Sequence, residues 1–128
     1  MGKRSSFGGQ IHSGSIPLGR TGRVGEPNFI TCSVAKAGAM AVMRSVTKAV
    51  GRYDVSANCI ALATIETPTT APVLAGKATR KAMLRHYLIK RLGRPADAAG
   101  LAVFLSSDAA SWITGQTYPV NGDYSSSL

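Results

Sequence analysis

This sequence of 128 residues has few cysteines, no clustered metal ligands and no long apolar segment. Its two cysteines, Cys32 and Cys59, are too few for the disulfide network of a small secreted domain. Neither stands at a spacing typical of metal ligands, and His12 and His86 are isolated, so we predict no metal site. No apolar run approaches the ~18 residues that span a bilayer, and no apolar segment follows the basic N-terminus. We therefore expect a cytoplasmic protein with no membrane span and no secretory signal.

Acidic residues are also scarce. Six Asp and Glu stand against fifteen Lys and Arg, which gives a net charge of +9. Basic residues concentrate between Lys77 and Arg94, with no acid among them. Such an excess favours anionic partners, but a nucleic-acid surface would interleave aromatic residues for stacking, and this stretch has only Tyr87. We therefore favour a solvated helix face beside a mobile loop over a nucleic-acid surface.

Apolar residues are plentiful, at 45% of the chain, which is enough for the core of one small domain or of part of a larger one. We treat residues 1–128 as a single partial domain with five segments. They are a degraded strand and a Gly- and Arg-rich loop at 1–32, a long helix at 33–51, a strand at 55–62, a loop and basic helix at 67–94, and a C-terminal helix and strand at 97–128.

The long helix is predicted from apolar residues at helical spacing, with Gly51 as the residue that closes it. One face carries the small residues Ala37, Gly38 and Ala41, so we expect it to approach a large partner surface closely.

The strand at 55–62 ends in a nearly continuous apolar run, which predicts burial on both faces, as in parallel sheets. The basic helix is expected at 76–90, with its apolar side chains pointing inward. Those side chains are Met83, Leu84, Tyr87 and Leu88.

Helices that alternate with buried strands predict an α/β fold with a parallel sheet. Only about three strands are predicted, about half of a doubly wound sheet. The fold class is therefore the C-terminal half of a doubly wound, Rossmann-type parallel sheet, left incomplete.

Three stretches, in their order and spacing, resemble the C-terminal half of the short-chain dehydrogenase/reductase family. They are SVAKAG at 33–38, RLGRPxD at 91–97 and FLSSDAASWITGQ at 104–116. Members of this family reduce carbonyls or oxidise alcohols with NAD(P), so the resemblance implies an NAD(P)-dependent oxidoreductase.

The resemblance also implies a catalytic Tyr-x-x-x-Lys pair, one helical turn apart, whose lysine bonds the nicotinamide ribose. Lys36 stands in the place of the lysine, but Cys32 stands in the place of the tyrosine. A thiol, with a pKa of ~8.5, can ionise beside a cation, but its arm is much shorter than a phenol. We favour a buried structural cysteine over a repurposed catalyst, and keep Cys32 and Lys36 as catalytic candidates. Gly19 occupies the position of the family's serine, which leaves Ser15, slightly earlier, as the third catalytic candidate.

After the buried strand, the family carries Pro-Gly-x-Ile-x-Thr, whose turn and threonine hold the nicotinamide carboxamide. This sequence keeps Ile65 and Thr67, but Leu62 and Ala63 replace the Pro-Gly pair. Because Pro fixes φ and Gly permits turns that Ala resists, the turn can still form but with less help from its own residues. The resemblance thus implies Lys36, Ile65 and Thr67 as cofactor-binding residues.

The family's Gly-rich dinucleotide fingerprint has no counterpart, because no Gly-x-Gly occurs anywhere in the sequence. NAD(P) is the cofactor implied by the resemblance, yet we do not expect this chain to bind it alone. The first hypothesis is therefore a truncated oxidoreductase, or pseudoenzyme, that acts on alcohol or ketone groups by descent but is inactive alone. The alternative is a non-enzymatic oligomerisation module or a non-functional fragment, with self-association through the 33–51 helix and the C-terminal segment.

Overall fold

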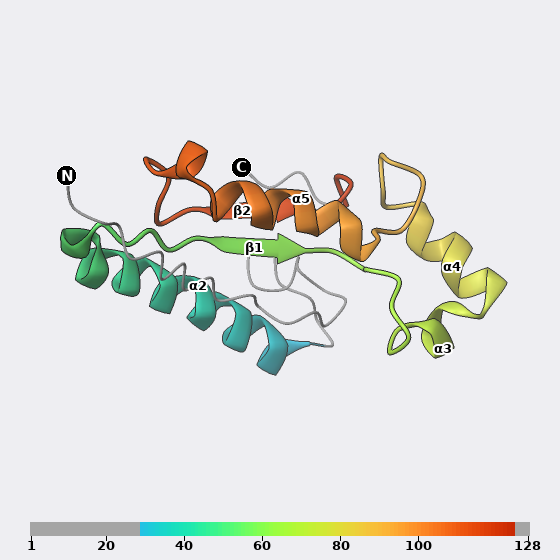
Figure 1. The fold of residues 1–128 in the computed structure, drawn as a ribbon. Helices are drawn as coiled ribbons and strands as arrows, with labels where there is room; N and C mark the ends of the chain where they lie inside the picture. Colours follow the sequence, from blue (N-terminus) through green and yellow to red (C-terminus); the bar gives the residue numbers. More distant parts are fainter. Residues whose placement is uncertain (1–28, 125–128) are drawn as a thin grey trace.

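The computed structural model describes residues 29–124, so Ser15 and the strand and loop expected before residue 29 lie outside the described part. The elements follow one another from a long helix to a final strand (Figure 1). They are α2 (Ile30–Val50), η1 (Gly51–Tyr53), β1 (Cys59–Leu62), α3 (Ala71–Leu74), α4 (Lys77–Leu84), α5 (Pro95–Leu105), η2 (Asp108–Ala110) and β2 (Thr117–Val120).

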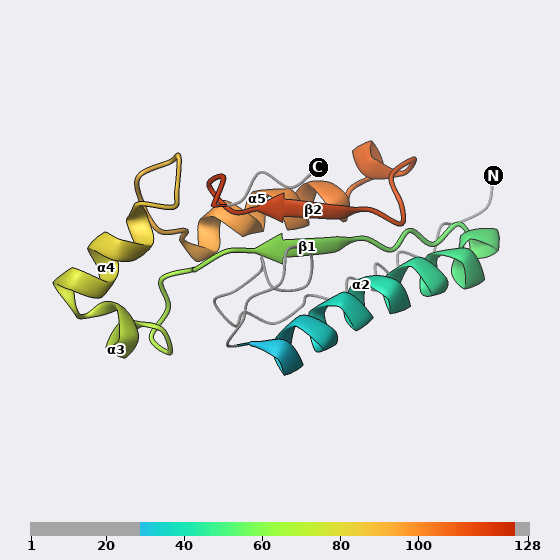
Figure 2. The ribbon, with the colours of Figure 1, turned by 180° about the vertical axis from the view of Figure 1, so that it is seen from behind.

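The two strands form a parallel sheet that lies between helices. β1 pairs with β2 in the register Cys59↔Thr117 to Leu62↔Val120. α2 runs along one side of the strand pair and α5 along the other (Figures 1 and 2). Successive side chains of β1 point to opposite faces, so Cys59 packs with Met43 of α2 while Ile60 packs with Leu105 of α5. This confirms the α/β class and the burial of β1 on both faces.

α2 begins at Ile30, three residues before the expected start at 33, and its first turn closes when the Ser33 N–H donates to the Phe29 carbonyl at 2.8 Å. Gly51 does not close the helix in the left-handed conformation, because its φ is −56° and the chain continues into η1. The left-handed residue is Asp54, with φ of 58°, at the end of η1. Asp tolerates this conformation better than most residues, so the chain turns there toward β1.

The two faces of α2 have different surroundings. Met43 is buried and Met40 and Val46 pack beside it against the sheet. The small residues predicted to approach a partner lie on the other side, where Ala37, Gly38 and Ala41 are exposed. Within residues 29–124, no helix combines the length and the apolar content that crossing a bilayer requires.

The basic helix is shorter than the expected 76–90. α4 ends at Leu84 because the next N–H groups bond three residues back, as when His86 donates to Met83 at 3.1 Å. Tyr87 is buried as predicted, but the prediction that Leu88 points inward is wrong, since 72% of it is exposed. Beyond the helix the chain instead runs to the turn that follows β2, where the Ile89 N–H donates to the Gly122 carbonyl at 3.1 Å.

The remaining boundaries shift by a few residues. β1 covers only 59–62 of the predicted 55–62, and the residues just before it are bonded largely by side chains, although the Gly115 N–H also donates to the Ala57 carbonyl at 2.8 Å. The Asn58 side-chain amide donates to the Ile113 carbonyl at 2.9 Å and accepts the Gln116 N–H at 3.1 Å. α5 starts at Pro95, where a proline suits the first helical turn.

Candidate functional site

The turn that follows β1 is closed by two threonines. The Thr70 hydroxyl lies 2.8 Å from the Ile65 carbonyl, to which it donates, and it accepts the Thr67 N–H at 2.8 Å. The Thr67 and Thr70 hydroxyls lie 3.1 Å apart. This network replaces the support that a Pro-Gly pair would give, so the predicted residues Ile65 and Thr67 are held in one turn. Sequence reasoning missed Thr70, although two hydroxyl residues three apart in a loop are a known turn signal.

Gly93 closes the same turn from another segment. Its N–H donates to the Thr64 carbonyl at 3.1 Å, and its carbonyl accepts the Glu66 N–H at 2.8 Å. A Cβ at this position would lie 2.5 Å from Cδ1 of Ile65, so only glycine fits without movement. The turn is thus bonded on both sides, by Thr70 within the loop and by Gly93 after α4.

An ion pair fixes the segment that carries Gly93. Arg91 donates to both carboxylate oxygens of Asp97, at 2.6 and 2.8 Å, and the Arg94 N–H donates to the same carboxylate at 2.6 Å. The hydrogen bonds from Arg91, and then that from Arg94, hold the pKa of Asp97 well below its usual range, while Asp97 raises the pKa of Arg91. One carboxylate therefore begins α5 and anchors the preceding loop.

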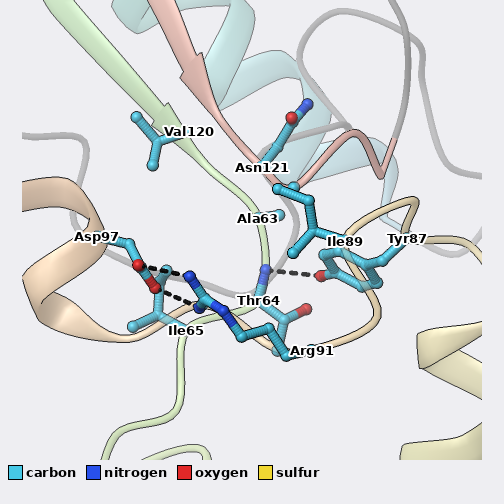
Figure 3. A pocket seen from close by; sticks show the side chains of 11 residues that line it. Ala63, Thr64, Ile65, Tyr87, Ile89, Arg91, Asp97, Val120 and Asn121 are labelled. Carbon is cyan, nitrogen blue, oxygen red and sulfur yellow. Dashed lines mark hydrogen bonds and ion pairs between the residues drawn. The ribbon is translucent and has the colours of Figure 1, made fainter.

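A cavity of about 250 Å³ opens beside the turn, at the carboxyl ends of β1 and β2 (Figure 3). Ala63, Ile65, Ile89 and Val120 give it apolar walls. The Arg91–Asp97 pair crosses one side of it, and on another the Thr64 N–H donates to the phenol oxygen of buried Tyr87 at 3.1 Å. Its lining is mostly apolar with a few fixed polar groups, which is typical of small-molecule sites.

The candidates on α2 share the helix face that looks toward the sheet. Cys32 and Lys36 are both half-buried and one turn apart. Burial raises the pKa of the Cys59 thiol on β1, and the positive charge of Lys36 opposes that rise, so the ammonium lies toward β1. The prediction that Cys32 is buried is wrong, because Cys32 is half-buried. The buried cysteine is Cys59.

Ser33, next to Cys32, is a polar group that sequence reasoning did not single out. Its hydroxyl oxygen is buried and has no hydrogen-bond partner among the residues that the structure describes, which is uncommon for a buried hydroxyl. α2 runs antiparallel to β1, so these first turns lie toward the same end of the molecule as the closed turn (Figures 1 and 2).

Comparison with known proteins places this geometry in a family. Residues 14–125 match the sequence profile of a family described as enoyl-(acyl carrier protein) reductase. The 3-oxoacyl-(acyl-carrier-protein) reductase of Pseudomonas aeruginosa is 34% identical over 119 residues, which are 93% of this chain and 46% of that protein. The chain belongs to the short-chain dehydrogenase/reductase family. It spans less than half the length of this relative.

Other members of the short-chain dehydrogenase/reductase family agree in sequence and structure. The 7alpha-hydroxysteroid dehydrogenase of Escherichia coli is 37% identical over 95 residues, 74% of this chain and 37% of that protein. A crystal structure of hydroxysteroid dehydrogenase from Escherichia coli superposes with a TM-score of 0.69 at 36% identity, over 74% of this chain and 39% of that one. A 4-hydroxyisoleucine dehydrogenase complexed with NADH has a TM-score of 0.83 at 21% identity, over 97% of this chain and half of that one, which speaks for the fold alone. The fold is an incomplete Rossmann-type sheet.

Proposed function

We propose that this chain forms the nicotinamide-facing and substrate-facing part of an NAD(P)-dependent oxidoreductase that interconverts alcohols and ketones. The observation that carries the proposal is the turn at 64–70, bonded on both sides and bordered by a small, mostly apolar cavity. Membership of the short-chain dehydrogenase/reductase family supports it.

The residues fit one end of the cofactor. Thr67 stands on the closed turn, where it would hold the carboxamide, and Lys36 faces the sheet from α2, where it would hold the ribose. The cofactor supplies the hydride when it is bound. The adenine end does not fit these 128 residues, because no Gly-x-Gly is present to receive the pyrophosphate.

The proton donor is the second missing group. Cys32 is one turn from Lys36, so the ammonium could favour its thiolate, but the thiol cannot reach as far as a phenol. Loss of a general acid costs about 10²–10⁴ in rate. We therefore propose that the 128 residues alone catalyse no hydride transfer, which an absorbance assay with NADH and NADPH on several ketones tests directly.

A half-cofactor separates binding from catalysis. Reduced nicotinamide mononucleotide lacks the adenine end, so we expect it to bind in a fluorescence titration no less tightly than NADH. Thr67→Val should weaken binding about tenfold, the equivalent of one hydrogen bond of about 1.4 kcal/mol. Thr69→Val, at an exposed neighbouring position, is the control and should bind as the wild type does. If the mononucleotide shows no saturable binding, the proposal is wrong.

The substrate would carry its ketone or alcohol on one of two kinds of molecule. The Pseudomonas aeruginosa relative is named for acyl groups joined to a carrier protein, and the Escherichia coli relative for a steroid. We propose the carrier-linked acyl group for this chain, since its basic segment between Lys77 and Arg94 suits an acidic carrier better than a neutral steroid.

A second candidate function is self-association through the 33–51 helix and the C-terminal segment. Large apolar side chains are exposed on both: 69% of Val34 and 55% of Val42 on α2, and 99% of Trp112 after η2. Patches of this kind mark interaction surfaces. Light scattering should therefore report an oligomer that Val34→Lys converts to monomer. Val73→Lys, at an equally exposed valine on α3, is the control. A monomeric wild type would refute this function.

A further inference from the structure

A row of basic side chains runs along the outer face of α4. Lys77, Lys81 and Arg85 are spaced four residues apart, so they share one face of the helix and its C-cap, and all three are exposed. We call these three residues the basic row. None of them has an ion-pair partner among the described residues.

The cations of the basic row differ from two neighbouring arginines, which form ion pairs within the fold. Arg80, on the inner side of α4, forms an ion pair with Glu66, and Arg91 pairs with Asp97. Both acids near the turn are thereby occupied, and nothing acidic in the described part of this segment faces the basic row. Two large apolar side chains in the flanking segments are also exposed, 66% of Val73 on α3 and 72% of Leu88 after α4.

The basic row is fixed beside the candidate site. The Arg80–Glu66 pair joins α4 to the turn that carries Ile65 and Thr67. On the packed side of α4, Met83 and Leu84 lie against the cluster that contains Tyr87, which lines the cavity. A molecule seated on the basic row would therefore lie across α4 from the turn and the cavity, about one helix diameter (~10 Å) away.

We propose that the basic row is the docking surface for an acidic acyl carrier protein, which delivers its thioester-linked acyl chain to the turn at 64–70. The proposal rests on the proposed function, whose substrate it specifies. A carrier protein suits the row because three exposed cations at helical spacing, none of them paired with an acid within residues 29–124, complement an acidic surface. Nucleic acid suits it less, because the aromatic residue of this segment, Tyr87, is 2% exposed and unable to stack on a base.

The test is a titration of fluorescently labelled, acylated acyl carrier protein with the full 128-residue chain. We expect saturable binding that weakens about tenfold when the ionic strength rises from about 0.05 to 0.3 M. The variant K77E/K81E should weaken binding about tenfold or more, since it turns two attractions into repulsions. The matched control is R44E/K48E, which reverses two exposed cations, also four apart, on α2. It should bind as the wild type does, and circular dichroism should show both variants folded.

Three results would overturn the proposal. In the first, K77E/K81E binds the carrier as tightly as the wild type. In the second, R44E/K48E loses as much affinity as K77E/K81E, which would make the effect one of net charge. In the third, a DNA duplex displaces the carrier, which would make the row a phosphate-binding surface. Binding of the mononucleotide is measured on the same preparations, so a failure of the cofactor proposal is distinguishable from a failure of docking.

Discussion

The two halves of the candidate site, the turn at 64–70 and the start of α2, differ in the hydrogen bonds that stabilise them. The turn at 64–70 is bonded from within by Thr70 and from outside by Gly93. Within residues 29–124, the start of α2 has no side-chain cap, and the buried Ser33 hydroxyl has no hydrogen-bond partner. The turn is thus closed by several bonds without a Pro-Gly pair, while α2 presents Cys32 and Lys36 as single side chains one helical turn apart. Backbone shape at such a site is maintained by several distant bonds, whereas its chemistry depends on single side chains.

The largest effect should come from the cluster beneath the turn. Leu92 is 1% exposed and packs with Tyr87 and Leu74, so Leu92→Ala should lower the free energy of unfolding by about 3 kcal/mol. Leu88→Ala is the control, because this leucine is 72% exposed and its loss should change stability by less than about 0.5 kcal/mol. Chemical denaturation of both variants measures the difference. Equal losses would mean that Leu88 is packed after all.

A smaller loss should follow when the inner bond of the turn is removed. Thr70→Val keeps the volume but leaves the Ile65 carbonyl and the Thr67 N–H without their partner, at a cost of about 2 kcal/mol. It should also weaken binding of the nicotinamide mononucleotide, because Thr67 would no longer be held. If Thr70→Val were as stable as the exposed control Thr69→Val, the turn would not depend on this network.

Alanine substitutions at two glycines, one at the turn and one in α5, test how closely Gly93 approaches the turn. A Cβ at Gly93 would meet Ile65, so Gly93→Ala should cost about 1 kcal/mol and displace the Ile65 side chain. A Cβ at Gly100, within α5, would meet nothing within 4 Å, so Gly100→Ala should stabilise by about 0.5–1 kcal/mol. Thermal unfolding should therefore show a lower melting temperature for Gly93→Ala and a higher one for Gly100→Ala than for the wild type. The same sign for both would show that Gly93 is not a close-contact position.

The sequence was sufficient for the fold and for one side of the site. The pattern of apolar residues predicted α2, β1, α5 and β2. It failed where distant residues decide the local conformation: beyond α4 the Ile89 N–H bonds to the Gly122 carbonyl instead of continuing a helix, and Leu88 is exposed. The motif around Arg91 was recognised from the sequence. Its ion pair with Asp97 and the close approach of Gly93 to Ile65 were not predicted, because residue spacing does not encode three-dimensional packing.

The smallest effect concerns acid sensitivity. Arg91 and the Arg94 N–H lower the folded-state pKa of Asp97, so the folded protein binds this proton less readily than the unfolded chain. The contribution of Asp97 is therefore fully present above the unfolded pKa of about 3.9 and is lost as the pH falls below it. The melting temperature of the wild type should fall between about pH 5 and pH 2 more steeply than that of Asp97→Asn or Arg91→Met. The pair is partly exposed, so added salt should reduce the difference. If the two variants kept the wild-type slope, the ion pair would not couple the loop to α5.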